Sequence, residues 1–222
     1  MLKIENYEVV GWEHAIRGMR NPKNSWDKID SNCNAFYVGI GPNDHKLMTS
    51  LAKGGPVHAK YRRMITVYLD ITAPLYWWKE FDTYKVGTVA NSCSTMHKIH
   101  DKEFESTDFS FEHLCLWDKM CPFNQILDAL NFYRDIYLNG GDVEWDDGRV
   151  VHFEPKNKNI WWQMIQLLPT SYNQKRTVML NYEVLHNIYF SRKDHKLDEW
   201  HTLCDWIKTL PYSELITMEA EN

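Results

Sequence analysis

The amino-acid sequence predicts an α+β protein, because strand-like and helix-like patterns of apolar residues both occur in it. Met64–Thr72 is rich in β-branched and aromatic side chains and alternates in polarity over much of its length, which is typical of a half-buried strand. Pro122–Leu138 carries apolar residues on one face at helical spacing. At 222 residues the chain can bury one sizeable core, and no repeat or low-complexity linker divides it, so we expect a single domain over residues 1–222.

The first third of the chain is expected to form short elements. These are a strand at Tyr7–Val10, a helix at Trp12–Met19, and a strand or helix end at Asn34–Ile40. Asp44 suits the N-cap of a helix that runs through Leu51, and Gly54-Gly55-Pro56 ends this helix. The basic residues that follow either meet an anionic group or form a solvated strand edge; they are His58, Lys60, Arg62 and Arg63.

After the central strand, which Pro74 ends, the pattern is mainly helical. We predict helices at Leu75–Phe81, Asn159–Leu168, Val178–Arg192 and Leu197–Leu210, with a turn at Thr170–Arg176. Residues 143–158 are acidic and rich in turn formers, and Asp146-Asp147-Gly148 is a candidate hairpin turn. We interpret this stretch as a flap or insertion over the core.

Charge and composition exclude several classes of protein. A net charge of −5 argues against binding of a nucleic acid polymer through its phosphate backbone, although a few local Lys and Arg suffice for a small nucleotide. The chain has no apolar span near the length of a membrane helix and no signal-like start, so we expect no membrane partner and a cytoplasmic location.

The cysteines and histidines do not predict a disulfide framework or a metal site. The five cysteines are odd in number and form no C-x-x-C pair; they are Cys33, Cys93, Cys115, Cys121 and Cys204. Cys93 lies in a polar stretch, where a nucleophile is conceivable and a buried inert thiol is the commoner case. None of the ten histidines has a known ligand spacing.

A polar segment follows the helix at Leu75–Phe81 and predicts a ligand site. It is crowded with donors and acceptors, namely Asp82, Thr83, Tyr84, Lys85, Thr88, Asn91, Ser92, Ser94, Thr95, His97 and Lys98. Such groups are costly to bury without partners, so a polar ligand is expected to satisfy them. Trp77 and Trp78 lie just before this segment, and we expect them to form an exposed apolar patch that a homo-oligomer covers.

This segment resembles the motif of the flavin-dependent thymidylate synthase (ThyX) family. The motif reads Arg-His-Arg, two residues, Ser, one residue, Asn, two residues, Ser, one residue, Arg-Tyr. With one extra residue allowed before the Asn, Thr83-Tyr84-Lys85 falls on Arg-His-Arg and Thr88 on the first Ser. Asn91 and Ser94 are identical to the motif, and Met96-His97 falls on Arg-Tyr.

Two flanking blocks extend the resemblance over about residues 47–200. Leu47–His58 is similar to the family's short helix and Gly-His turn. Leu168-Pro169 and Asn181–Arg192 resemble Leu-Pro, then Asn-Leu-Arg, a second Asn and a terminal Leu-Arg. The spacing of Asn181, Asn187 and Arg192 holds without gaps, whereas Glu183 stands in place of the flavin-contacting Arg.

Arg192 is the candidate catalytic residue. On the predicted helix it shares a broad face with Asn181 and Ile188, and a guanidinium on a largely apolar helix needs an anion or a pyrimidine edge to justify partial burial. The alternative is an arginine that interacts with the dipole at the helix C-terminus.

The resemblance implies a fold with a central, mostly antiparallel sheet flanked by helices. It implies reductive methylation of dUMP with FAD as cofactor, methylenetetrahydrofolate and NADPH as co-substrates, and a homotetramer. It places the flavin on Tyr84, Lys85, Thr88, Asn181 and Asn187, and the nucleotide on Ser92, Ser94 and Arg192. Because several arginines of the family are absent, two alternatives stay open: a non-catalytic protein that binds a nucleotide or another partner, and a flavin or nucleotide enzyme with a changed substrate.

Overall fold

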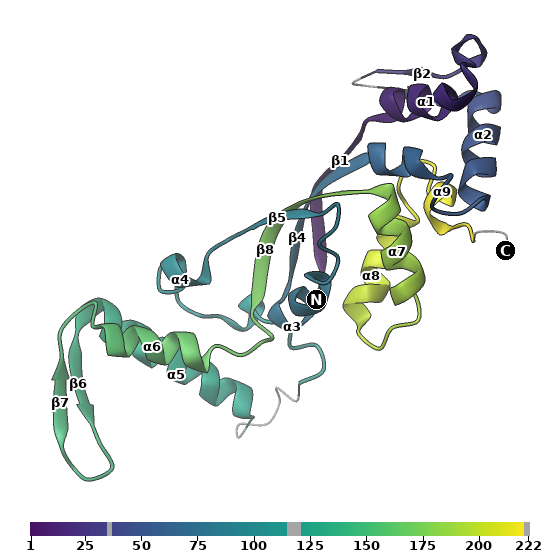
Figure 1. Ribbon diagram of the computed structural model, residues 1–222. Coiled ribbons are helices and arrows are strands. Elements are labelled where there is room, and N and C mark those ends of the chain that lie inside the picture. The colour runs from purple at the N-terminus through teal and green to yellow at the C-terminus, as the bar shows by residue number, and fades with distance from the viewer. Residues whose placement is uncertain (35–36, 115–120, 220–222) are drawn as a thin grey trace. The chain divides into compact units, whose positions relative to one another are not determined.

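The computed structural model describes residues 1–34, 37–114 and 121–219 and is a mixture of helices and strands (Figure 1). The chain divides into two compact units. We call the first the hairpin unit; it consists of Met1, Ala73–Lys79 and Ser92–Lys175. The second, the sheet unit, consists of Leu2–Thr72, Glu80–Asn91 and Arg176–Asn222. Whether the two fold as one domain over residues 1–222 stays a prediction.

A four-stranded antiparallel sheet is the main β structure, as predicted. Its order is β1-β4-β8-β5, with β1 at Lys3–Val10, β4 at Thr66–Pro74, β8 at Asn173–Asn181 and β5 at Val89–Ser92. β4 buries Val67, Leu69 and Ile71 and leaves the residues between them more exposed, which is the alternation that the sequence predicted. β1 pairs with β4 in antiparallel register, with a shift between Glu5 and Glu8.

Short helices make up the rest of the sheet unit. They are α1 at Trp12–Arg20, α2 at Pro42–Lys53, α7 at Tyr182–Arg192, α8 at Asp198–Ile207 and α9 at Glu214–Thr217. Single-turn 3₁₀ helices lie at Asn21–Lys23 (η1), Trp26–Lys28 (η2) and Lys60–Met64 (η3), and β2 at Asn32–Cys33 pairs with β3 at Val38–Gly39. α7 packs against α8, α9 and η3. In the part of the chain that the structure describes, no helix is both long enough and apolar enough to cross a membrane.

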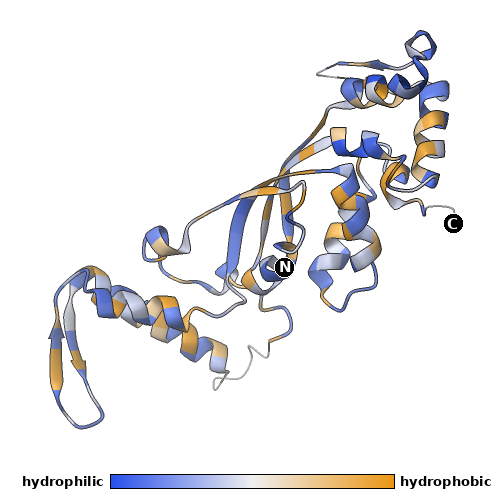
Figure 2. Cartoon of the chain, in the orientation of Figure 1, coloured by the Kyte–Doolittle hydropathy of each residue, from blue (hydrophilic) through white to orange (hydrophobic). Residues whose placement is uncertain are grey.

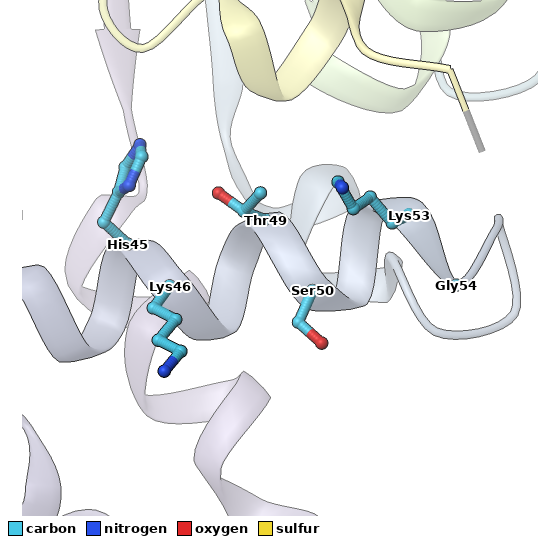
Figure 3. Close-up of a pocket in the computed structure, with 6 residues that line it drawn as sticks. All are labelled: His45, Lys46, Thr49, Ser50, Lys53 and Gly54. Carbon is cyan, nitrogen blue, oxygen red and sulfur yellow. The ribbon is translucent and has the colours of Figure 1, made fainter. Parts of the chain in front are cut away.

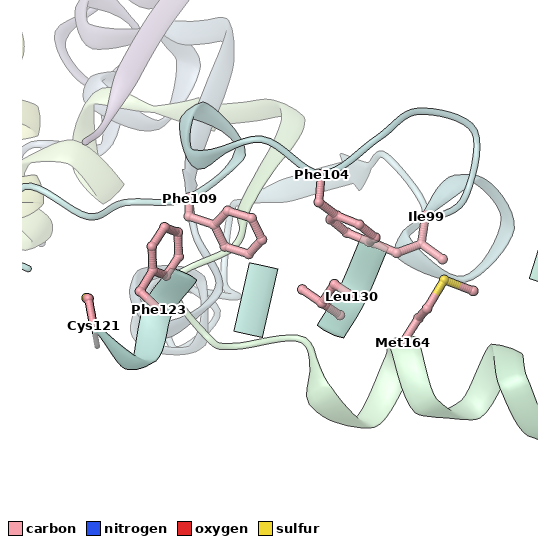
Figure 4. Packing of buried hydrophobic residues seen from close by; sticks show 7 residues of the cluster. All are labelled: Ile99, Phe104, Phe109, Cys121, Phe123, Leu130 and Met164. Carbon is pink, nitrogen blue, oxygen red and sulfur yellow. The ribbon is translucent and has the colours of Figure 1, made fainter. Parts of the chain in front are cut away.

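The hairpin unit has its own apolar core. Its elements are α4 at Thr95–Lys98, η4 at Ser106–Asp108, α5 at Pro122–Asn139, β6 at Gly141–Glu144, β7 at Val150–Phe153 and α6 at Lys158–Leu167. α5 packs on α6, and the buried cluster contains Ile99, Phe104, Phe109, Cys121, Phe123, Leu130 and Met164 (Figure 4). Because these side chains come from the loop before α5 and from both helices, they fix the loop onto the helix pair.

The hairpin turn that the sequence predicted is present between β6 and β7. The backbone N–H of Trp145 donates to the carbonyl of Arg149 at 2.8 Å, and the N–H of Gly148 donates to that of Trp145 at 2.8 Å. The hairpin exposes apolar surface, since Val150 is 62% exposed and both strands carry hydrophobic residues (Figure 2). That residues 143–158 act as a flap or insertion stays a prediction.

One predicted helix is partly wrong. Residues 178–181 belong to strand β8, and the strand also replaces the end of the turn predicted at Thr170–Arg176, because it starts at Asn173. Val178 and Leu180 are buried while Thr177 is exposed, which is a period of two. The helix starts at Tyr182 because Asn181 caps it: its Oδ1 accepts from the backbone N–H of Val184 at 3.0 Å.

The expectation of an exposed tryptophan patch is also wrong. Trp77 and Trp78 lie in α3, at Leu75–Phe81, and are 0% and 1% exposed. Their rings meet edge to face with centroids 4.9 Å apart, and Trp78 Nε1 donates to the carbonyl of Gln174 at 2.9 Å. The apolar residues of α3 are therefore core, and the predicted homotetramer rests on the family resemblance alone.

Candidate ligand site around helix α7

The C-terminal end of α7 brings two of the predicted site residues together. Arg192 lies in its last turn, where its Nε donates to Tyr84 Oη at 2.9 Å and its Nη1 donates to Glu80 Oε2 at 3.0 Å. The side chain of Arg192 is 19% exposed, and the side chain of Glu80 is 35% exposed. The guanidinium is thus oriented by two partners, while part of the side chain still faces solvent.

Glu80 is the centre of this group. Its Oε2 also accepts from Trp200 Nε1 at 2.9 Å and lies 3.4 Å from His195 Nε2. The backbone N–H of Leu197 donates to His195 Nδ1 at 3.2 Å, which leaves the proton of the neutral ring on Nε2, toward Glu80. The guanidinium of Arg192 lies 4.7 Å from the centre of the Trp200 ring. We call Glu80, Tyr84, Arg192, His195 and Trp200 the Arg192 cluster.

Sequence reasoning missed three members of this cluster. They are Glu80, His195 and Trp200, which no motif in the sequence marks as site residues. Glu80 is separated by 112 and 120 residues from Arg192 and Trp200. No local spacing signals such a contact, because it depends on how α3 meets α7 and α8.

At the other end of α7, the loop before β5 lies against Asn181. Gly87 has φ of +81°, a conformation that favours glycine, and a Cβ built on it would make a tight contact of 3.0 Å with Asn181 Nδ2. The neighbouring Thr88 has a buried Oγ1 without a hydrogen-bond partner, whereas Lys85 is exposed. A buried hydroxyl left unpaired costs free energy, so a polar ligand would stabilise this loop.

The other predicted residues take part in none of these contacts. Asn187 is exposed on α7. Ser92 and Ser94 are exposed and belong to the hairpin unit. Ser94 is the N-cap of α4, and its Oγ accepts from the backbone N–H groups of Met96 and His97, each at 3.2 Å. Among the predicted site residues, Tyr84 and Arg192 are therefore hydrogen-bonded to each other. Thr88 directly follows Gly87, which lies against Asn181.

The first turn of α7 faces inward. Glu183, which stands where the family resemblance expects an arginine, is buried and forms an ion pair with Arg62 Nη1 at 3.6 Å. Nε and Nη2 of Arg62 and Oε2 of Glu183 are buried without a hydrogen-bond partner. One turn on, His186 Nδ1 donates to the carbonyl of Ile216 at 2.7 Å, and burial lowers the pKa of His186 below its ordinary value.

Neither a metal cluster nor a reactive thiol stands out in the described residues. Residues 1–34, 37–114 and 121–219 contain no group of three or more His, Cys, Asp or Glu placed to hold a metal ion. The thiols of Cys33, Cys93, Cys121 and Cys204 are free, and Cys115 lies outside the described residues. Burial raises the pKa of the Cys204 thiol to about 11, which keeps it protonated and unreactive at neutral pH.

The chain is similar in fold to solved nucleotide-methylating enzymes. A thymidylate synthase X from Helicobacter pylori with FAD and dUMP superposes with a TM-score of 0.63 at 16% identity, covering 99% of this chain and 98% of that one. A second structure of the H. pylori flavin-dependent enzyme, complexed with FAD and dUMP, gives 0.62 at 16% identity, with 98% and 97% covered. A UMP/dUMP methylase, PolB from Streptomyces cacaoi, bound with 5-Br dUMP, gives 0.58 at 12% identity, with 98% and 94% covered.

These similarities show the fold and not the activity. The chain matches no protein-family model and no curated protein. Identities of 12% and 16% leave the site residues free to differ, so the fold is that of the flavin-dependent thymidylate synthases, as predicted, and function has to be argued from the site.

Proposed function

We propose that this chain is a flavin-dependent methylase of a pyrimidine nucleotide, which converts dUMP to dTMP with methylenetetrahydrofolate and NADPH. The observation that carries the proposal is the shared fold over 99% of the chain with an enzyme whose structure holds FAD and dUMP. A likeness over nearly the whole chain is a stronger argument than a single aligned motif, because it includes the order of all the main elements along the chain.

The residues proposed to hold the flavin fit such a group in donor type. The unpaired, buried hydroxyl of Thr88 offers one hydrogen bond, the exposed Asn187 an amide, and Lys85 a cation for a phosphate. Asn181 fixes the backbone beside them through its cap and its approach to Gly87. Bound there, FAD would supply the hydride chemistry, while the protein supplies orientation.

Arg192 is proposed to contact the pyrimidine ring. A guanidinium carries five N–H donors, and the contacts to Tyr84 and Glu80 use one on Nε and one on Nη1. The remaining donors can meet a ring oxygen, on which negative charge develops when the proton is removed from C5 of the pyrimidine and its electron pair delocalises into the ring. Tyr84 and Glu80 then hold the guanidinium plane, and Ser92 and Ser94 stay predicted nucleotide contacts.

A second candidate, a non-catalytic nucleotide-binding protein, is favoured by one observation. Where the family resemblance expects a flavin-contacting arginine, Glu183 is buried against Arg62 and offers no charge to an anion. The loss of that contact would weaken flavin binding while leaving the nucleotide side intact.

Absorbance of the purified protein tests the proposal first, because bound flavin is visible without knowledge of any substrate. Titration calorimetry with FAD and with dUMP then separates the two candidates, and tritium release from labelled dUMP measures turnover. Binding of both molecules with turnover supports the enzyme. Binding of dUMP without FAD supports the non-catalytic protein, and binding of neither on a folded sample overturns both.

The predicted homotetramer is tested separately. Light scattering over a range of protein concentrations should report four chains. A stable monomer at every concentration contradicts this part of the proposal, and it would fit the burial of Trp77 and Trp78 within the chain.

A further inference from the structure

A hollow of about 750 Å³ lies within the hairpin unit, between the β6–β7 hairpin and the helices α5 and α6. We propose that this hairpin hollow docks a basic, extended segment of a partner protein, whose apolar side chains enter the hollow and whose arginine side chains meet its rim. None of the described residues that line it belongs to the site around α7, so the inference goes beyond the proposed function. A cavity of this size is typical of sites that bind a ligand.

One face of the hairpin is apolar and only partly covered. Val143 pairs with Val151 across β6 and β7, and Phe153 lies two residues further along β7, so these three side chains share one face. All three line the hollow together with Trp145. Val143, Val151 and Phe153 are half-buried, and Trp145 is 51% exposed. Because a two-stranded hairpin depends on cover for its apolar face, a partner that lies on this face would stabilise it.

The helices supply the opposite wall of the hollow. Tyr133 of α5 packs against the buried cluster, and Ile160 of α6 is 2% exposed, so the wall is fixed to the core of the hairpin unit. Asn159 and Gln163 of α6 also line the hollow. Their side-chain amides can pair with the N–H and C=O groups of an extended segment, which makes no backbone hydrogen bonds of its own.

The charge of the rim favours a basic occupant. Three carboxylates line the hollow, those of Glu144, Asp146 and Asp147, and its described lining includes no Lys or Arg. Residues 142–154 contain five Asp and Glu against one Arg, a net charge of −4. Glu144 and Asp146 are exposed, and neither carboxylate has an ion-pair partner among the residues that the structure describes. An acidic rim over an apolar floor matches cations on apolar stems and repels an acidic partner.

Arg149 shows how the rim holds a guanidinium. Its Nε donates to Asp147 Oδ2 at 2.7 Å, and its guanidinium carbon lies 5.5 Å from the centre of the Trp145 ring. A cation–π contact is thus combined with a charge-assisted hydrogen bond. The side chain of Arg149 is 71% exposed, so an arginine of the partner can displace it at little cost. The carboxylates of Glu144 and Asp146 are left for further arginines.

A hollow along α2 is a weaker candidate. It is about 670 Å³ in volume, and in Figure 3 His45 and Lys53 project from one side of the helix while Lys46 projects from the other. His45 Nε2 already pairs with Glu214 Oε1 at 2.7 Å. None of its described lining residues has a large apolar side chain, so nothing there corresponds to the apolar floor of the hairpin hollow.

The test is fluorescence anisotropy of a short labelled peptide that alternates Arg and Leu, titrated with the full chain. The hairpin variant, Glu144→Gln/Asp146→Asn, removes two rim charges. The matched variant, Glu8→Gln/Asp27→Asn, removes two exposed carboxylates that do not line the hollow. All four residues are exposed, so both variants should fold. We expect micromolar affinity that weakens as salt is raised, and a loss on the order of tenfold in the hairpin variant only.

Two further variants separate recognition from a structural effect of the hairpin. Trp145→Leu keeps an apolar side chain but removes the ring, so the affinity for the peptide should fall about tenfold. Arg149→Gln frees Asp147 and the Trp145 ring, so the affinity should rise about threefold. A hairpin with only a structural role would not bind the peptide more tightly when Arg149 is lost.

Control ligands define the occupant. Weaker binding of peptides with Glu in place of Arg, or with Ser in place of Leu, supports a segment that is both basic and apolar. Equal weakening by the hairpin and matched variants, or no binding of the Arg-Leu peptide in low salt, overturns the proposal. Displacement by spermidine at a lower concentration than by unlabelled peptide also overturns it, because the hollow would then hold a small cation.

Two measurements on the protein without peptide complete the test. If light scattering shows that the hairpin variant loses an assembly present in the parent, a second copy of the chain occupies the hollow and a separate partner is ruled out. Equal assembly in both supports the proposal. Flavin absorbance of the hairpin variant should equal that of the parent, so loss of peptide binding is distinct from failure of the proposed function.

Discussion

The ion pairs at the two ends of helix α7 differ in burial and in hydrogen bonding. At its start, Glu183 pairs with Arg62 at 3.6 Å, and their side chains are 8% and 1% exposed. At its end, Arg192 pairs with Glu80 at 3.0 Å, with side-chain exposures of 19% and 35%. The first pair leaves buried polar atoms unsatisfied, whereas in the second Glu80 also accepts from Trp200 and Arg192 also donates to Tyr84.

This difference favours the C-terminal end of α7 as the end that would contact a ligand. A buried pair with poor geometry is costly to form and more costly to break, so it acts on folding. A partly exposed pair contributes less stability than a buried one is expected to, so its well-formed hydrogen bonds are better explained as orientation of the guanidinium. We therefore expect changes at the start of α7 to affect unfolding and changes at its end to affect ligand chemistry.

The largest effect is expected from breaking the buried pair. Arg62→Leu leaves the carboxylate of Glu183 buried and unpaired, which should lower the free energy of unfolding by about 3–5 kcal/mol. Urea unfolding followed by circular dichroism measures this change. The double variant Arg62→Leu/Glu183→Leu removes both charges and should recover most of the loss.

The exposed pair of Arg149 and Asp147 provides the control for this experiment. Their side chains are 71% and 53% exposed, so Arg149→Leu should cost less than about 1 kcal/mol. Two results would contradict the expectation: a fall of less than about 1 kcal/mol in the free energy of unfolding of Arg62→Leu, and a double variant as unstable as the single one. Either result would mean that the buried pair at the start of α7 does not stabilise the fold.

At the C-terminal end of α7, Arg192→Ala should reduce turnover on the order of 100-fold, because a positioned donor at developing charge is worth a few kcal/mol. Arg192→Lys should restore little, since an ammonium cannot reproduce the planar fork that reaches Tyr84 and Glu80. Unfolding should change by only about 1 kcal/mol, because water can solvate Glu80.

Tritium release from labelled dUMP and complementation of a thymidine-requiring bacterial strain measure the effect. Arg17→Ala is the control: Arg17 is exposed on α1 and its Nη2 hydrogen-bonds His14 Nδ1 at 3.2 Å, so its loss should leave turnover unchanged. If the parent complements and Arg192→Ala does so at equal expression, Arg192 is a helix-end charge without a catalytic role.

The sequence predicts those helices, strands and turns whose residue pattern depends on neighbours in the chain. The alternation of Met64–Thr72, the turn at Asp146-Asp147-Gly148 and the apolar face of Pro122–Leu138 each depend on neighbours in the chain, and each element is present. The predicted helix over residues 178–181 failed because those residues pair in a sheet, which periodicity over four residues does not reveal. Burial of Trp77 and Trp78 depended on distant segments in the same way.

The candidate site shows the same limit. The motif predicts Tyr84 and Arg192 as site residues, and a hydrogen bond joins them in the structure. The motif does not point to the residues around Arg192, which are Glu80, His195 and Trp200. The contacts of Glu80 with Arg192 and Trp200 span more than a hundred residues, and His195 lies in a loop that carries no motif. Motif spacing finds residues that touch a ligand more readily than residues that position them.

A smaller effect should reveal whether a ligand also reaches the loop beside the start of α7. Thr88→Val removes a buried hydroxyl that has no partner in the protein, so the free energy of unfolding should stay equal or rise slightly. If flavin bonds to this hydroxyl, FAD affinity should fall about tenfold, the equivalent of one hydrogen bond. Titration calorimetry with FAD measures it.

Thr49 is the matched control, because its Oγ1 is also buried without a partner and it lies on α2. Thr49→Val should leave FAD affinity unchanged. If the parent, Thr88→Val and Thr49→Val bind FAD with equal affinity, Thr88 does not contact the flavin. The proposed ligand contacts would then be limited to the Arg192 end of α7.

The smallest effect concerns His186, which reports on the dielectric environment of the buried end. Burial lowers its pKa below the ordinary 6.5; the carbonyl of Ile216 raises it, the charge of Arg62 lowers it and the charge of Glu183 raises it, in decreasing order. The folded protein therefore binds fewer protons at this ring than the unfolded chain does. The stability that this provides is complete above about pH 6.5 and is lost as the pH falls through the lowered pKa.

Unfolding free energies measured from about pH 7 to about pH 5 should accordingly fall more steeply in the parent than in His186→Asn, which keeps an N–H for the Ile216 carbonyl and cannot titrate. His201→Asn, at an exposed position of α8, should keep the steeper slope of the parent. If His186→Asn and the parent have the same slope, water reaches His186, and the low dielectric that makes the Arg62–Glu183 pair costly to break is absent. The two ends of α7 would then differ in geometry but not in solvation, and the assignment of ligand chemistry to the Arg192 end would have to rest on the orientation of its guanidinium alone.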